Sequence, residues 1–435
     1  MKNFQNTVLF CTVGGSHVPI VRAIESAQPR FVCFFCTDRD PATNNPGSST
    51  QITGKGMVIK RDQREEKPSL PNIPDQLGLA ADQFEACVIP ADDLDGAISA
   101  MHAAIMKISD KFRGAKLIAD YTGGTKTMSA ALVCAALERE EMELRLVTGP
   151  RGNLKQVRQG TEQPVVASMV GSRLNKRIKL SLDCWSRYAY QQALSELSTI
   201  SPVAANAPFR EKLDVVRLLS DAFARRDAFD HGGAFGLLQD YGGPIGKVWP
   251  NMLRDLRLLI DDQSSLRTPM RILDLWRNAE RRAVQGRFDD AVARAYRLIE
   301  WTAQWQLRSK CEIETADVPV DKMPQSISIK PAADGKIKLG LWHSWQLAAH
   351  HLGEPIASLV DDSAGRKLRD LLEIRNQSIL AHGDKPVTED NWEQMRQWME
   401  GDFFPVFDKL AGEVGLRKKP DQLPRDLPDG VLGNP

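Results

Sequence analysis

The sequence has no long hydrophobic segment and almost no excess of charge. No run of about 18 apolar residues occurs in its 435 residues, and the N-terminal stretch has no apolar run of signal-peptide length. Lysine and arginine together number 57 and acidic residues 56, for a formal net charge of +1. We therefore expect a cytoplasmic protein with no membrane partner, in which any nucleic-acid site is a local basic patch.

Cysteine is sparse and scattered, with seven residues in all. Cys33 and Cys36 have the spacing of a redox or zinc pair, but three positions along a strand place two thiols on opposite faces. Five cysteines, including Cys134, lie in apolar runs. We expect buried, reduced thiols that bind no metal.

The first 175 residues alternate short apolar segments with helical patterns, which predicts βαβ units. The fold class is therefore α/β, with a Rossmann-like parallel sheet whose strands are apolar because both faces are covered. A loop over Asp38–Gly54 is expected to line the ligand crevice. The predicted strands are Thr7–Val13, Phe31–Thr37, Phe84–Ile89, Lys116–Tyr121 and Glu143–Thr148, and the predicted helices are Val18–Ala27, Asp93–Lys111 and Gly124–Arg139.

Beyond residue 175 the pattern is helical almost to the end. We expect a helical linker region over 176–265, an all-helical domain over 266–415, and a polar, Pro-rich tail over 416–435 that is extended or disordered. Asp230-His231-Gly232-Gly233 is expected to form a loop. The predicted helices are Leu180–Leu197, Phe209–Phe229, Met252–Asp261, Arg271–Val284, Phe288–Leu307, Asp362–Leu380 and Asn391–Leu410.

Two loops in the α/β part have the composition of an anion-binding site. The first, Thr12-Val13-Gly14-Gly15-Ser16, opens a helix with Ser16 as the expected N-cap and Pro19 in the first turn. The second runs from Asp120 through Thr122, Gly123, Gly124, Thr125 and Lys126 to Thr127. Each loop offers glycines, hydroxyls and free backbone N–H groups at a helix start, which favours an anion, although such glycines also occur in tight turns that bind nothing.

Neither loop matches the common nucleotide-binding motifs. In a Walker A loop glycine directly precedes the lysine, but Thr125 precedes Lys126 here. Gly14-Gly15-Ser16 does not supply the dinucleotide motif G-x-G-x-x-G. A kinase-like NTPase and an NAD enzyme are both disfavoured.

The run from Arg375-Asn376 to His382 supplies groups that can cut RNA without a metal. Arg375 and His382 are seven residues apart, so on one helix they would share a face. The arginine can neutralise a phosphate, and the histidine can move protons near neutral pH. The alternative is a surface arginine paired with Glu373 or Asp370 on a helix that ends at Gly383.

These motifs resemble those of a known family. The loops around Thr12–Ser16 and Asp120–Met128 resemble those of the CARF domain, the CRISPR-associated Rossmann fold, and Arg375, Asn376 and His382 resemble the hallmark of a HEPN domain. The segment Arg271–Glu300 is similar to the long helices of one CARF–HEPN subfamily of type III CRISPR ribonucleases. The resemblance covers most of the chain, except residues about 180–260 and the tail.

The resemblance implies a homodimer whose CARF pocket binds cyclic oligoadenylate, a tetramer or hexamer, as allosteric activator. Thr37 and Asp38 are added to that pocket on geometry alone. With these two included, the expected ligand contacts are Thr12, Gly14, Gly15, Ser16, Thr37, Asp38, Thr122, Gly123, Gly124, Thr125 and Lys126.

For the HEPN domain, the resemblance implies an endoribonuclease with no metal or other cofactor. It would cut single-stranded RNA in antiviral defence and leave 2′,3′-cyclic phosphate ends. His382 would be general acid or base, Arg375 would stabilise the transition state, and Asn376 would position the phosphate or orient His382. A non-catalytic sensor or regulator, and a CARF pocket that degrades its own ligand, remain the alternatives.

Other residues have two interpretations. The run Glu280-Arg281-Arg282, with Arg287, belongs either to an RNA groove or to a solvated helix face. Trp276, Trp301 and Trp305 are expected to pack helices rather than stack on bases.

Overall fold

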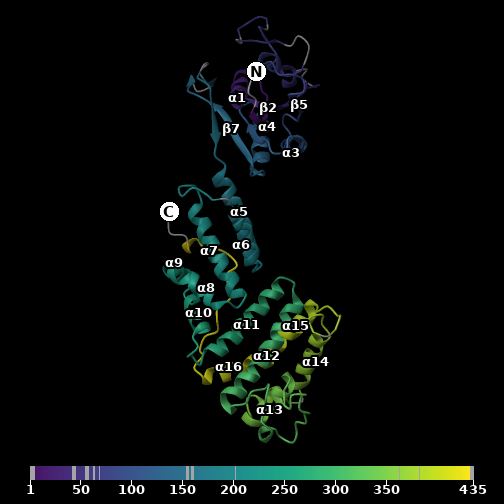
Figure 1. The fold of residues 1–435 in the computed structure, drawn as a ribbon, viewed down its shortest axis with the longest axis vertical. Coiled ribbons are helices and arrows are strands. Elements are labelled where there is room, and N and C mark those ends of the chain that lie inside the picture. Colours follow the sequence, from purple (N-terminus) through teal and green to yellow (C-terminus); the bar gives the residue numbers. More distant parts are fainter. Residues whose placement is uncertain are drawn as a thin grey trace. The chain divides into compact units, whose positions relative to one another are not determined.

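A computed structural model of the protein contains two compact units, residues 1–175 and 176–435, shown in Figure 1. Within the described residues, no helix is both long and apolar enough to span a membrane. The structure describes residues 5–41, 46–53, 58–61, 64–67, 69–152, 156–157, 161–200, 202–361, 363–381 and 383–431.

The first unit is built on a six-stranded sheet with the strand order β10-β7-β6-β1-β2-β5. The five predicted strands are all present and parallel, but a sixth strand, β10, pairs antiparallel with β7. The predicted Rossmann-like parallel sheet is therefore confirmed, and it carries one antiparallel edge strand, β10, that the sequence does not predict. The strands are β1 (Gln5–Thr12), β2 (Pro29–Cys36), β5 (Phe84–Val88), β6 (Lys116–Asp120), β7 (Met142–Thr148) and β10 (Gln163–Ala167).

Helices cover both faces of this sheet, which explains its apolar strands. Along β1, Val8 and Phe10 pack into the core under α3 and α4, whereas Leu9 and Cys11 pack into the core under α1. The helices are α1 (Val18–Ala27), α2 (Ile73–Leu77), α3 (Leu94–Lys111) and α4 (Lys126–Leu137), with a 3-10 turn at Ser48–Gln51 and short strands β3 (Val58–Ile59), β4 (Leu70–Pro71), β8 (Arg151–Gly152) and β9 (Gln156–Val157).

The described part of the second unit is helical. The predicted helix Leu180–Leu197 is two helices, α5 and α6, because the chain turns at Tyr188 with a φ of 57°. Asp230 is an N-cap and not part of a loop: its side chain accepts from the Gly233 N–H at 2.8 Å, and α8 begins at His231. The helices are α5 (Val170–Trp185), α6 (Tyr190–Ser198), α7 (Arg210–Asp227), α8 (His231–Leu238), α9 (Gly242–Val248), α10 (Met252–Ile260), α11 (Arg267–Val284), α12 (Phe288–Cys311), α13 (Leu341–Leu352), α14 (Ala364–Asn376), α15 (Glu389–Trp398) and α16 (Phe404–Glu413), with a π-helical turn at Met399–Phe403.

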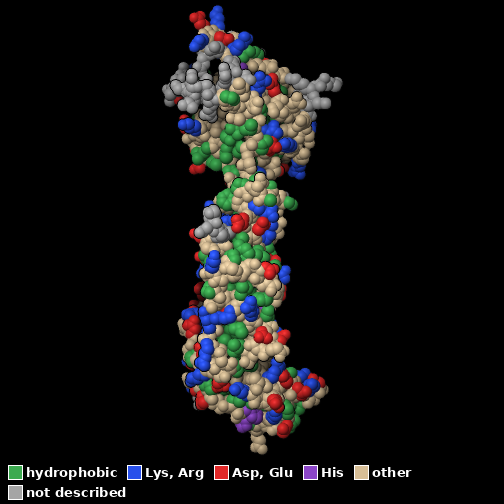
Figure 2. All heavy atoms as spheres, turned by 90° about the vertical axis from the view of Figure 1, so that its left-hand side faces the viewer, with side chains coloured by type: hydrophobic (Ala, Val, Ile, Leu, Met, Phe, Trp, Pro, Cys, Tyr) green, Lys and Arg blue, Asp and Glu red, His purple; other side chains and the backbone are tan. Residues whose placement is uncertain are grey.

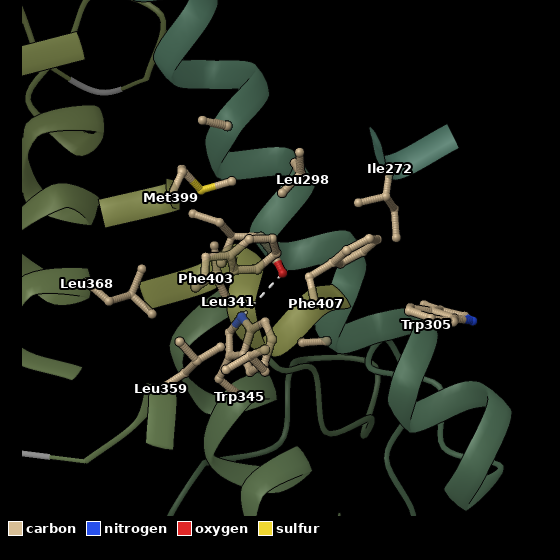
Figure 3. Packing of buried hydrophobic residues seen from close by; sticks show 14 of the residues in the cluster. Ile272, Leu298, Trp305, Leu341, Trp345, Leu359, Leu368, Met399, Phe403 and Phe407 are labelled. Carbon is tan, nitrogen blue, oxygen red and sulfur yellow. Dashed lines mark hydrogen bonds between the residues drawn. The ribbon is translucent and has the colours of Figure 1, made fainter. Parts of the chain in front are cut away.

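Aromatic side chains from distant segments form the core of this unit, shown in Figure 3. The Trp345 indole N–H donates to the Ile299 carbonyl at 3.2 Å, and Phe403 stacks on Phe407. Trp276 and Trp305 are buried in the same core, so their predicted packing role is confirmed.

The C-terminal tail is extended and packs against helices of the second unit, so the alternative of disorder is wrong for residues 417–431. Asp421 lies at its centre: its N–H donates to Asp255 at 3.0 Å, and its carbonyl accepts from Arg226 at 3.2 Å. The Tyr190 hydroxyl donates to the Pro424 carbonyl, and Leu423 is buried. The tail, whose polar composition predicts disorder, instead forms hydrogen bonds with buried polar groups of the helices.

The surface charges and the cysteines can be compared with the expectations from composition. Acidic and basic side chains are interspersed over the face in Figure 2, in keeping with the net charge of +1. All seven cysteines are free thiols, as predicted, but only four are buried: Cys87 and Cys311 are half-buried, and Cys134 on α4 is exposed.

Candidate functional sites

The two glycine-containing loops of the first unit meet at one edge of the sheet. They follow β1 and β6, which are parallel neighbours, so their C-terminal ends coincide. A Cβ at Gly14 would lie 2.6 Å from the Gly124 nitrogen, and a Cβ at Gly123 would lie 2.3 Å from the Thr12 carbonyl oxygen. Glycine is required at Gly14 and Gly123 because the two backbones touch.

Three of the predicted hydroxyls hold these loops in place. Thr12 is buried and donates to the Gly123 carbonyl at 2.7 Å. Thr122 accepts from the Val147 N–H at 2.7 Å, and Thr125 caps α4 by accepting from the Met128 N–H at 3.2 Å. These hydroxyls are used within the fold, where they hold the two loops in place.

Buried Asp120 fixes the start of the second loop. Its carboxylate accepts from the Thr122 N–H at 3.0 Å. Burial raises the pKa of Asp120, although the hydrogen bonds from Thr122 oppose the shift. Asp120 thus acts as an anchor beneath the loop.

The groups left free at this edge suit an anion. Gly15 and Ser16 are exposed, and Lys126 is exposed at the first turn of α4 with no ion pair to any residue that the structure describes. The N-cap of α1 is His17 and not Ser16, and it makes no side-chain capping bond, while Pro19 lies in the first turn as predicted. Burial lowers the pKa of His17, which favours its neutral form.

The loop after β2 reaches the same edge. Thr37 bonds Ser48 through both backbone and side chain, and Asp38 is exposed beside it. Gln51, for which no sequence pattern predicts a role, donates to the Gly14 carbonyl at 2.6 Å. Its Oε1 is buried and has no partner among the described residues.

The C-terminal motif lies at the end of a helix and not along one. Helix α14 ends at Asn376, and Ser378 then pairs with Lys385, so the chain turns back on itself. The Gly383 N–H donates to the Ser378 carbonyl at 3.2 Å. The prediction that Arg375 and His382 share one helical face is therefore wrong, as is the helix stop at Gly383. His382 lies outside the described residues.

Arg375 is held by an aromatic ring rather than by a carboxylate. Its guanidinium carbon lies 4.5 Å from the centre of the Tyr296 ring on α12, and its Nη1 donates to the Asn376 side chain at 3.2 Å. Glu373 accepts instead from Gln377 at 2.9 Å. Arg375 makes no ion pair with any described residue, so the predicted surface pair with Glu373 or Asp370 is absent and its charge is available to a phosphate.

Part of the second unit matches a known protein family. Residues 262–402 match the family described as the Csm6 HEPN domain, and this span includes Arg375 and Asn376. The second unit contains a HEPN domain.

Solved structures extend the likeness to the whole chain. Csm6 of Enterococcus italicus, solved with cyclic hexa-2′-fluoro-hexa-dAMP, is 12% identical, with a TM-score of 0.52 over 94% of this chain and 99% of its own. Can2 of Sulfobacillus thermosulfidooxidans, in complex with cyclic tetra-adenylate, is 11% identical, with a TM-score of 0.23 over 56% of this chain and 69% of its own. No curated protein matches the chain. The family model identifies a HEPN domain over residues 262–402, and the Csm6 likeness shows that the whole chain has a fold of the kind that the CARF–HEPN resemblance predicts.

A matched pair of glycine substitutions tests the CARF loops. Gly123→Ala is expected to destabilise the first unit by about 1–3 kcal/mol, because its Cβ meets backbone that cannot move aside. Gly15→Ala is the control: a Cβ there meets nothing within 4 Å, so we expect a change within about 0.5 kcal/mol. Thermal unfolding measures both, and equal unfolding temperatures would contradict the close approach of the loops.

The ring under Arg375 gives a test of the HEPN site. Tyr296→Ala is expected to lower kcat for RNA about three- to tenfold, because a partly desolvated cation–π contact contributes about 0.5–1.5 kcal/mol to holding the guanidinium. Tyr296→Phe keeps the ring and should retain nearly full activity. If the two variants lose activity equally, the hydroxyl and not the ring face supports Arg375.

Proposed function

We propose that this protein is a CRISPR-linked endoribonuclease that cyclic oligoadenylate activates and that cuts single-stranded RNA without a metal. The observation that carries the proposal is the match of residues 262–402 to the Csm6 HEPN domain, which encloses the Arg375-Asn376 motif. The Csm6 structure of similar fold holds a cyclic hexanucleotide analogue, which supports a cyclic ligand for the CARF loops.

The reaction follows from the chemistry of the motif. The RNA 2′-hydroxyl attacks the adjacent phosphorus, and the bond to the 5′-oxygen of the next nucleotide breaks. The products are a 2′,3′-cyclic phosphate and a 5′-hydroxyl. Arg375 stabilises the charge that develops on the phosphate oxygens, His382 moves a proton, and Asn376 holds the phosphate.

The ligand lies at the edge where the CARF loops meet. Backbone N–H groups of Gly14, Gly15, Gly123 and Gly124, with Ser16 and Lys126, face its phosphates. Thr12, Thr122 and Thr125 shape the pocket from beneath, and Thr37 and Asp38 border it.

The active form is a homodimer. One chain carries one Arg375 and one His382, and two copies complete a composite site. Ile379 and Leu380, which follow Asn376 closely, are 68% and 53% exposed and offer apolar surface to a second copy. Ligand binding controls cutting by favouring one arrangement of the two HEPN domains over another.

Product chemistry tests the nuclease directly. A labelled RNA is incubated in EDTA with a cyclic oligoadenylate, and the ends are identified by mass spectrometry. We expect 2′,3′-cyclic phosphate ends, and no cleavage at a position whose nucleotide is 2′-deoxy. Cleavage at the deoxy position, or loss of activity in EDTA, would contradict the mechanism.

A further inference from the structure

A second basic site lies in the helical unit, and Arg375 is not among the residues that line it. A pocket of about 610 Å³ opens between the turn joining α5 to α6, the end of α7, and the turn joining α11 to α12. This volume lies within the range of about 300–1,000 Å³ that is usual for small-ligand sites. Four arginines and one aspartate supply its charges: Arg187, Arg282, Arg287, Arg294 and Asp227.

Asp227 and Arg282, which line the pocket, belong to a largely buried charge cluster whose third member, Arg281, lies behind the lining. Arg281 and Arg282 both bond the carboxylate of Asp227, and the Arg281 side chain is fully buried. The two guanidinium groups thus share one negative charge. Both also keep a buried nitrogen, Nη2 of Arg281 and Nε of Arg282, with no partner among the described residues. Burial of these side chains rules out the solvated-face interpretation of Arg281 and Arg282.

The rim of the pocket is more open and is also basic. Arg287 and Arg294 share the carboxylate of Asp290, and the Arg287 side chain is 53% exposed. Arg187 is exposed and makes no ion pair with any residue that the structure describes. Among the lining residues, four arginines accompany one carboxylate, and Asp290 behind the rim supplies a second. An excess of cation in partly desolvated surroundings attracts anions, although the chain as a whole is nearly neutral.

The walls of the pocket are fixed. The Gln285 side chain donates to the carbonyls of Arg187 and Tyr188, both at 3.1 Å, and so joins the two turns that carry the rim arginines. Arg294 is held by Asn278 and Asp290. A site whose donors are already oriented loses little entropy when it binds.

We propose that this pocket binds phosphate groups of the substrate RNA, outside the bond that is cut. Planar guanidinium groups bind phosphate oxygens in pairs, and the exposed amides of Gln191 and Gln192 beside them can bond bases or sugars. Arg294 and Tyr296 are two residues apart on α12 and point to opposite sides of it. The pocket therefore adds affinity for RNA and does not touch the reacting atoms. The inference rests on the proposed function, because that function supplies the RNA.

The double variant Arg187→Gln/Arg287→Gln tests the proposal. Binding of a 2′-O-methyl RNA, which cannot be cut, is measured on the full-length protein by fluorescence anisotropy across salt concentrations. We expect about tenfold weaker binding, and a slope against log salt that falls by about 1.4, or about 0.7 for each lost phosphate contact on a single strand. With cleavable RNA, KM should rise by a similar factor while kcat changes little.

The matched control removes the same charge elsewhere. Arg113→Gln/Arg308→Gln replaces two arginines that are 83% and 69% exposed, and it should leave the RNA affinity unchanged. Equal RNA binding by the two double variants overturns the proposal. Loss of ATP or inorganic phosphate binding in Arg187→Gln/Arg287→Gln with unchanged RNA binding also overturns it, because the pocket is then a site for a small anion.

The two proposals fail separately. If wild type cuts RNA while Arg187→Gln/Arg287→Gln binds and cuts it as wild type does, only the pocket proposal fails. If wild type binds the uncleavable RNA through this pocket but never cuts RNA with any activator, the proposed nuclease function fails and the pocket stands.

Discussion

Replacing Arg375 by alanine is expected to slow RNA cleavage by about 10²–10³-fold, the usual effect of removing one preorganised group that stabilises transition-state charge. The structure supports this because Arg375 makes no ion pair with any described residue and lies on the Tyr296 ring. Single-turnover cleavage with saturating activator measures the effect. The activator affinity should not change, since Arg375 and the CARF loops belong to different units.

Two further variants make this test specific. Arg375→Lys keeps the charge but loses the planar fork, so it should recover only a small part of the rate. Arg308→Ala removes an exposed arginine that pairs with Glu314, and it should cut RNA at the wild-type rate. If Arg375→Ala retains half or more of the wild-type rate, Arg375 is not catalytic.

Replacing Lys126 by glutamine is expected to weaken activator binding by about 10–100-fold, because a hydrogen bond to a charged group contributes about 1.5–3 kcal/mol. Lys126 is exposed at the start of α4 and has no ion pair within the described part of the chain, so its loss should not disturb the fold. A titration of RNA cleavage against activator should show a higher midpoint and the same maximal rate at saturation.

Lys107→Gln is the control for Lys126. Lys107 is a 70% exposed lysine of the same unit, and it pairs with Glu85. It should leave the activation midpoint unchanged. A midpoint that moves equally in both variants would mean that the activator responds to overall charge and not to a contact with Lys126.

Local pattern predicted the first unit well. The helix Val18–Ala27 has the same bounds in sequence and structure, and each predicted strand is present within a few residues. The reason is physical: β1 alternates Val8 and Phe10 on one face with Leu9 and Cys11 on the other, and both faces are buried. A short apolar segment between two helical patterns is therefore readily predicted to be a buried strand. Strand β10 is not predicted from the sequence, because its residues at the sheet edge are exposed or partly exposed.

The structural features that local sequence patterns do not predict depend on tertiary contacts. Helical periodicity continues past Asn376, but α14 ends there because Ser378 pairs with Lys385, a contact that no local spacing reveals. Tyr296 lies 79 positions before Arg375, and Gln51 lies in a polar loop, so neither carries a signal of its role. The polarity of the tail favours disorder in the sequence, but in the structure its polar groups form hydrogen bonds with buried residues such as Asp255.

Activation of RNA cleavage by a ligand of the first unit can be measured in a single experiment. The rate of cleavage of a fluorescent single-stranded RNA in EDTA is compared for protein alone, with cyclic tetra-adenylate and with cyclic hexa-adenylate, with His382→Ala as the control. We predict cleavage that depends on one ring size and is lost in His382→Ala. Equal rates with and without ligand would contradict the allosteric account, and ligand binding without any cleavage would make the protein a sensor and not a nuclease.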